Sequence, residues 1–121
     1  MIPIEKFGRD HWGTFSYIEC RVVDNGGSPR LEHMRTDKTR HPGAALSDPD
    51  GKLYPTRLKN GEEIKNHDDW DCVDDLESAG LIKQTGTGVN PRFELTELGW
   101  NFSKELRRHK GTGGNFGNFT P

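Results

Sequence analysis

Four side chains have the types and spacing for a metal site. His67 and Asp71 are four residues apart, so a helix would place both on one face, and His33 or His41 from upstream could complete the set. None of the histidines belongs to an HExxH motif. The simpler alternative is that His67 begins a helix while His33 and His41 are ordinary polar loop residues. A metal-dependent hydrolase or nuclease built on these four residues is therefore one alternative function.

The two cysteines offer less support for nucleophilic catalysis. Cys20 and Cys72 both fall within apolar helical patterns, where buried cysteines usually pack without reacting. The sequence contains no GxSxG motif, no P-loop and no GxGxxG followed by a helix. We therefore predict no catalytic residue and no cofactor.

Acidic side chains concentrate in one segment. Residues 67–80 contain six of them and neither Lys nor Arg, in a chain whose net charge is only −2. At 100° per residue, a helix here places four carboxylates on the face opposite its apolar stripe: Asp68, Asp71, Asp74 and Asp75. We predict that this face either docks on a basic protein surface or is solvated, with some acids favoured near the helix N-terminus.

A tryptophan marks a second candidate surface for a protein partner. Trp100 lies roughly opposite the apolar stripe of the last predicted helix, beside Lys104 and Arg107. A Trp flanked by cations can anchor an interface, or its ring can be covered by their aliphatic stems. We favour the anchor.

The elements that position these side chains follow from apolar spacing and turn residues. The first half predicts a helix over residues 10–24 (a strand is the alternative), a short helix over 28–35, a long loop over 36–55 and a hairpin with a two-residue turn at Asn60-Gly61. The second half predicts a helix over 68–79, strands over 82–85 and 92–95, and a last helix capped by Thr96. The predicted fold is thus α+β, with helices packed on short β-hairpins and a long central loop.

One core is expected to join these elements. Its members pair apolar character with helical or strand periodicity, and they pack with the helix over 10–24: Trp70, Val73, Leu76, Phe93, Leu98, Phe102 and Leu106.

The order of elements in the second half resembles the C-terminal half of winged helix-turn-helix domains, notably MarR- and PadR-like bacterial regulators. The matching residues are Asp75-Leu76-Glu77-Ser78-Ala79-Gly80-Leu81-Ile82 and Phe93-Glu94-Leu95-Thr96-Glu97-Leu98-Gly99. The resemblance implies one winged-helix-like domain over residues 1–110, and dimerisation through terminal helices. It also implies duplex DNA binding through the helix over 68–79 and basic residues of the wing and last helix: Lys83, Arg92, Arg107, Arg108 and Lys110.

Two features depart from that family. Asn60-Gly61 stands where the family places its second helix, so only the segment 28–35 could supply it. Four aspartates on the helix that would enter the major groove repel phosphates, whereas duplex affinity rests largely on Lys and Arg. We therefore expect a small non-catalytic module that binds a protein partner or regulates an assembly, with a DNA-binding regulator as the alternative.

Composition places limits on the class of protein. The chain has 121 residues, of which 30% are apolar, which suits one domain near the lower edge for a self-supporting core. No apolar run approaches the roughly 18 residues of a membrane span, and the first residues lack a signal-peptide pattern. We predict a cytoplasmic protein that does not associate with membranes.

The Gly-rich tail over residues 111–121 has the composition of a flexible linker. Its large apolar groups are Phe116 and Phe119. We predict that both rings dock, either in a groove on their own domain or as an arm on a second copy of the chain.

Overall fold

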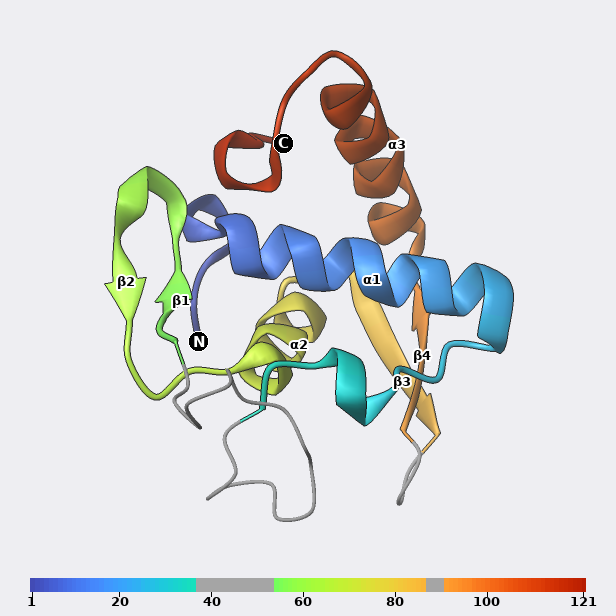
Figure 1. Ribbon diagram of the computed structural model, residues 1–121. Helices are drawn as coiled ribbons and strands as arrows, with labels where there is room; N and C mark the ends of the chain where they lie inside the picture. The colour runs from blue at the N-terminus through green and yellow to red at the C-terminus, as the bar shows by residue number, and fades with distance from the viewer. Residues whose placement is uncertain (37–53, 87–90) are drawn as a thin grey trace.

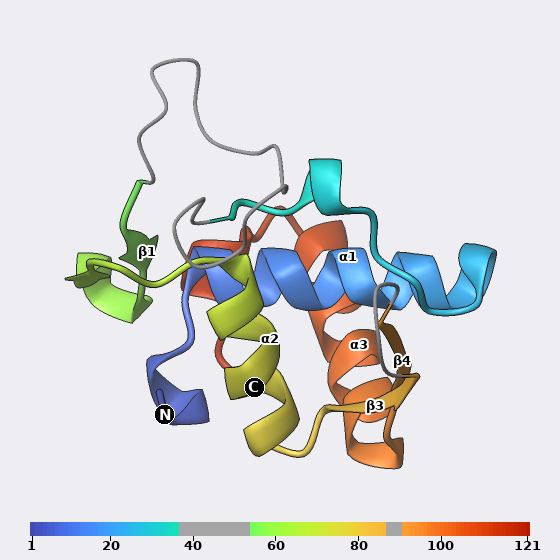
Figure 2. The same ribbon diagram turned by 90° about the horizontal axis from the view of Figure 1, so that it is seen from below.

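The computed structural model describes residues 1–36, 54–86 and 91–121. The helix α1 (Arg9–Asn25) crosses the molecule and lies between α2 (Asp69–Ser78) and α3 (Glu97–Gly111), as Figures 1 and 2 show from two directions. Two antiparallel hairpins complete the fold: β1 (Thr56–Arg57) with β2 (Glu63–Ile64), and β3 (Ile82–Gly86) with β4 (Arg92–Leu95). The architecture is α+β, as the sequence predicts.

The segment predicted as helix or strand near the N-terminus is the helix α1. Trp12, Phe15 and Ile18 are fully buried on one face of it, because their spacing matches the helical repeat. The helix ends at Gly26 in the left-handed conformation. The next residue, Gly27, also has a positive φ, and a Cβ there would lie 2.0 Å from the carbonyl oxygen of Phe93 on β4. Only glycine fits where the chain leaves α1 and passes this strand.

The predicted helix over 28–35 is wrong. The chain forms only the 3₁₀ turn Leu31–His33. Arg35 then pairs with the start of α2: its N–H donates to Asp69 Oδ2 (2.7 Å), and its carbonyl accepts from the Asp69 N–H (2.9 Å). The backbone of Arg35 therefore bonds to Asp69 and not within a helix over 28–35. Among the described residues no α-helix stands between α1 and α2, and the β1–β2 hairpin precedes α2. Most of the predicted loop over 36–55 lies outside the described residues.

The predicted hairpin at Asn60-Gly61 is confirmed, with a wider turn. Leu58 N–H donates to the carbonyl of Glu62 (2.7 Å), so three residues, Lys59–Gly61, form the turn. Asn60 and Gly61 both adopt positive φ angles there, a conformation that these residue types tolerate best.

The second half matches its predicted order of elements. Asp68 and Thr96 cap α2 and α3, each accepting a hydrogen bond from a backbone N–H of the first turn. The strands β3 and β4 pair with an irregularity between Gln84 and Gly86. Gly99 lets α3 approach the hairpin closely, because a Cβ there would lie 2.0 Å from the carbonyl oxygen of Leu81.

The core contains most of the predicted residues and one clear exception. Val73, Leu76, Phe93 and Leu106 are buried, while Trp70 and Phe102 are partly buried against the same cluster. Leu98 is 44% exposed, so its predicted place in the core is wrong. The reason is that its neighbour Gly99 faces the hairpin and turns Leu98 aside.

The C-terminal tail packs on its own chain. Phe119 is buried and meets the Trp12 ring edge to face, with centroids 4.9 Å apart. Phe116 is partly buried, close to Gly13 of α1 and below the ammonium of Lys110. Asn115 and Asn118 form a reciprocal capping box at the 3₁₀ turn Phe116–Asn118. These contacts offset the conformational entropy that a Gly-rich segment loses when it becomes ordered.

We predict that Leu76→Ala lowers the free energy of unfolding by about 2–5 kcal/mol, because it empties a fully buried position on α2. Leu98→Ala, with the same chemical change at an exposed position, should stay within about 0.5 kcal/mol of wild type. Urea denaturation of both variants measures the difference. Similar losses at the two positions would contradict the registers of α2 and α3.

We also predict that Phe119→Ala lowers the free energy of unfolding by about 3–5 kcal/mol, because the ring packs on Trp12 in the core. Deletion of the exposed Thr120 and Pro121 is the matched control and should leave the melting temperature unchanged. An unchanged melting temperature for Phe119→Ala would mean that the tail does not pack on the domain in solution.

Candidate functional site

A buried carboxylate bridges two imidazoles at the centre of the molecule. His11 Nε2 donates to Asp75 Oδ2 (2.8 Å), and His67 Nε2 donates to the same oxygen (2.9 Å). The other carboxylate oxygen accepts from the backbone N–H of Ile2 (3.2 Å). His11 and Asp75 are buried, and His67 is nearly so. The carboxylate therefore has the several donors that a charge needs in an apolar interior.

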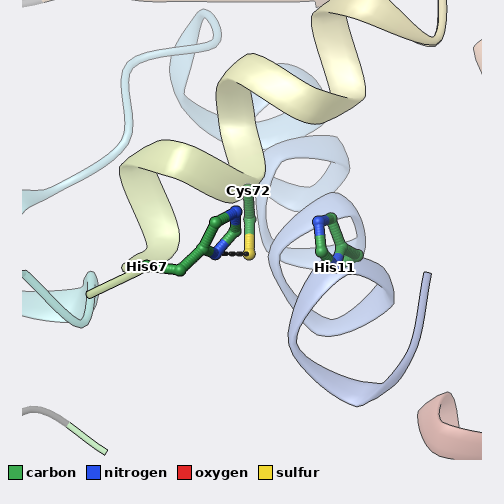
Figure 3. A group of neighbouring side chains, drawn as sticks. All are labelled: His11, His67 and Cys72. Carbon is green, nitrogen blue, oxygen red and sulfur yellow. Dashed lines mark hydrogen bonds between the residues drawn. The ribbon is translucent and has the colours of Figure 1, made fainter. Parts of the chain in front are cut away.

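Three elements bring these side chains together. His11 lies in the first turns of α1, where Phe7 stacks on its ring at 4.2 Å. His67 directly precedes Asp68, the N-cap of α2. Cys72 and Asp75 are three residues apart on α2, so they share the helix face that meets α1. Figure 3 shows Cys72 between the two imidazoles.

A second set of contacts, which involves Thr56 and Arg35, positions His67. Thr56 Oγ1 lies 2.8 Å from His67 Nδ1 and 2.7 Å from the His67 carbonyl oxygen. Arg35 Nη2 donates to that same hydroxyl (2.7 Å), and its Nε donates to Asp69 Oδ1 (3.3 Å). The imidazole is thereby tied to β1, to the segment after α1 and to the first turn of α2.

The cluster also contains a thiol. Cys72 Sγ lies 3.9 Å from His67 Nδ1, and Cys72 has no exposed surface. One ligand atom from each of His11, His67 and Cys72 lies within 4.8 Å of the others. Among the described residues no other group of three such side chains gathers as closely.

Burial controls protonation in this cluster. It lowers the pKa of His11 below the usual value, against the opposing influence of Asp75. Burial also raises the pKa of the Cys72 thiol far above its usual range. At neutral pH the site therefore holds a neutral His11 and a protonated thiol.

Within the described residues, the members of the predicted metal set do not come together. His33 is exposed, and its Nδ1 lies 2.9 Å from the Tyr17 hydroxyl. Asp71 completes the capping box with Asp68. His41 lies outside the described residues. Of the predicted set, only His67 belongs to the observed cluster. Sequence reasoning missed His11 because 64 residues separate it from Asp75, and helical spacing carries no information over that distance.

The predicted face of four exposed aspartates is wrong. Asp68 and Asp75 are buried, Asp68 as the N-cap and Asp75 as the partner of two histidines. Asp71 is half-buried in the capping box, and Asp74 alone of the four is exposed. Partial burial and the neighbouring carboxylates raise the pKa of Asp74. Asp74 has no ion-pair partner within the described parts of the chain.

The other predicted surface residues are spread over α3. Trp100 is 38% exposed, and Lys104 is exposed. Arg107 donates through Nε and Nη2 to the buried carboxylate of Glu19 (2.8 and 2.6 Å), which also accepts from Ser103. Arg107 is therefore occupied within its own chain, whereas Trp100 and Lys104 remain accessible.

The residues predicted to touch DNA lie on the β3–β4 hairpin and on α3. Lys83 pairs with Glu94 across the β3–β4 hairpin (3.9 Å). Lys110 lies 4.4 Å above the Phe116 ring. Arg92 and Arg108 are exposed, one on β4 and the other near the end of α3. The tip between β3 and β4 lies outside the described residues.

We predict that Asp75→Asn lowers the free energy of unfolding by about 1.5–3 kcal/mol, because an amide cannot replace a charged acceptor for two imidazoles. Asp74→Asn makes the same change one residue away on the exposed side and should leave stability equal or slightly higher, since it removes a repelled charge. Urea denaturation at pH 7.5 with a chelator present measures both. Equal effects would contradict the bridging role of Asp75.

None of the described helices combines the length and apolar content needed to span a bilayer. Comparison of the chain with protein-family models, with curated proteins and with solved structures finds no match.

Proposed function

We propose that this chain is a small non-catalytic module that binds a protein partner through the outer face of α2 and the first turns of α3. The observation that carries the proposal is the exposure of Leu98 and Trp100 in the first turns of α3, together with the exposed carboxylates of Asp74 and Glu77 on α2. Large apolar side chains left at the surface beside charges are typical of interface anchors.

Hydrogen bonds join the residues that follow α2 to the N-cap of α3. The Thr96 N–H donates to the Leu81 carbonyl (3.1 Å), and its hydroxyl donates to the Gly80 carbonyl (2.5 Å). The first turn of α3 is thereby held beside the end of α2. A rigid surface costs less ordering entropy when a partner binds.

The non-catalytic part of the proposal rests on burial. Cys72, His67 and Asp75 have the residue types of a nucleophile, a base and an orienting carboxylate. However, Cys72 has no exposed surface, and burial disfavours its thiolate. A substrate cannot reach this thiol without opening the core.

The partner that fits this surface is a protein segment with basic and apolar side chains. Asp74 and Glu77 attract cations, and α2 contains no Lys or Arg to oppose them. Trp100 offers a large ring for an apolar contact, with Lys104 beside it on the next turn. A second copy of the chain is the homodimer alternative.

A winged-helix-like arrangement belongs to this proposal. It is supported by the order α2, β3–β4 hairpin and α3, in which the hairpin corresponds to a wing. A DNA-binding regulator is the second candidate, favoured by the exposed Arg92 and Arg108. The acidic outer face of α2 argues against it, because carboxylates next to phosphates are repulsive.

Affinity capture from the native host tests the proposal. We expect wild-type chain to retain a protein that the double variant Asp74→Lys/Glu77→Lys and the variant Trp100→Ala each bind at least 10-fold more weakly. Glu62→Lys reverses an exposed charge next to the β1–β2 turn, and it should bind like wild type. Binding of the purified partner is then measured by calorimetry.

Equal retention by all variants would overturn the proposed surface. Self-association that Trp100→Ala abolishes would identify the partner as a second copy. Duplex binding tighter than about 1 μM with a steep salt dependence would instead favour the DNA-binding candidate.

A further inference from the structure

The cluster around Asp75 has a donor set that suits a transition metal. Two imidazoles and a thiol are the ligands that bind Zn²⁺ and related ions in proteins, whereas Mg²⁺ and Ca²⁺ prefer oxygen. These donors come from α1, from the residue before the cap of α2 and from α2 itself. A site of this kind can join segments that lie far apart in the sequence.

The spacing of the donors is close to what such an ion requires. Bonds of about 2.0–2.3 Å in a tetrahedron place two ligand atoms roughly 3.3–3.6 Å apart. The observed Sγ–Nδ1 distance between Cys72 and His67 is 3.9 Å, and all three ligand atoms lie within 4.8 Å of one another. Binding of an ion therefore requires the donors to move somewhat closer together.

The bonds around the imidazoles also match those of metal-ligating histidines, which usually donate their second N–H to a carboxylate. Asp75 accepts from Nε2 of both rings, which leaves Nδ1 of each ring for another partner. His11 Nδ1 is buried and has no hydrogen-bond partner among the described residues. His67 Nδ1 faces the Cys72 sulfur and shares the Thr56 hydroxyl. A buried nitrogen without a partner is costly, and a metal ion would satisfy it.

We propose that His11, His67 and Cys72 bind a divalent transition-metal ion of the zinc class, and that Asp75 positions the two imidazoles. On binding, the Cys72 S–H bond breaks, its proton leaves to solvent and the sulfur lone pair forms a bond to the ion. The histidines bind as neutral rings, and no electron is transferred. This proposal is independent of the partner-binding surface.

The consequence is a metal-stabilised link between α1 and α2. Because the unfolded chain does not hold these donors together, binding energy becomes folding energy. The ion would fix the orientation of α2, whose outer face carries Asp74 and Glu77.

Untagged full-length chain tests the site directly. After chelator treatment, titration with Co²⁺ should give one ion per chain and a thiolate-to-cobalt charge-transfer band. Titration of the metal-free chain with Zn²⁺ should release protons and raise the melting temperature, and Zn²⁺ added to the Co²⁺-loaded chain should displace the Co²⁺. Failure of the wild-type chain to bind Co²⁺, or binding without the charge-transfer band, would overturn the proposal.

Matched variants assign the ligands. Cys72→Ser should abolish the charge-transfer band, whereas Cys20→Ser, at the exposed cysteine, should keep it. His11→Gln should weaken binding at least 10-fold, and His33→Gln should not. Loss of the band in Cys20→Ser, or an unchanged band in Cys72→Ser, would contradict the assignment.

The positioning role of Asp75 has a separate readout. Asp75→Asn should raise the dissociation constant about 10- to 100-fold while keeping the charge-transfer band at saturating Co²⁺, because the sulfur ligand is intact. Asp74→Asn should bind like wild type. An unchanged dissociation constant in Asp75→Asn would show that Asp75 does not position the metal ligands.

Discussion

The buried carboxylate of Asp75 is the interaction on which the rest of the structure depends. It accepts from His11 of α1, from His67 before α2 and from the backbone of Ile2. A buried charge must have such donors, because transfer out of water would otherwise cost several kcal/mol. The requirement constrains the N-terminal segment, α1 and α2 to one mutual arrangement.

A second layer of polar contacts extends this constraint outward. Thr56 holds His67 in place, and Arg35 reaches both Thr56 and the Asp69 carboxylate. These contacts tie β1 and the segment after α1 to the start of α2. Apolar packing of Trp12, Phe15 and Ile18 fills the space beside this network. The polar contacts specify the arrangement that the non-directional apolar contacts stabilise.

The acidic segment shows how one residue type performs different tasks. Asp68 and Asp71 satisfy backbone donors at the start of α2, Asp69 pairs with Arg35, and Asp75 bridges the histidines. Only the remaining carboxylates, Asp74 and Glu77, are left at the surface. The number of acidic residues in a segment therefore does not show how many carboxylates are exposed at the folded surface. Helix caps and buried hydrogen-bonded pairs occupy several of them.

Local sequence determined the elements whose stabilising contacts are local. Helical spacing predicted α1 and α2, the capping residue Thr96 predicted where the last helix begins, and Asn60-Gly61 predicted a hairpin. Such features depend on hydrogen bonds and sterics within a few residues. The segment over 28–35 failed because Arg35 forms its bonds with Asp69, which is 34 residues away.

The candidate site was decided by tertiary structure. His67 was recognisable as a candidate metal ligand, whereas Cys72 was expected to pack without reacting, and the residues that these two meet were not predicted. His11 meets Asp75 across 64 residues, and Leu98 is turned outward because Gly99 packs on the Leu81 carbonyl. A sequence pattern specifies which face of a helix is apolar. Which other element covers that face, and which polar groups meet there, depends on how the whole chain packs.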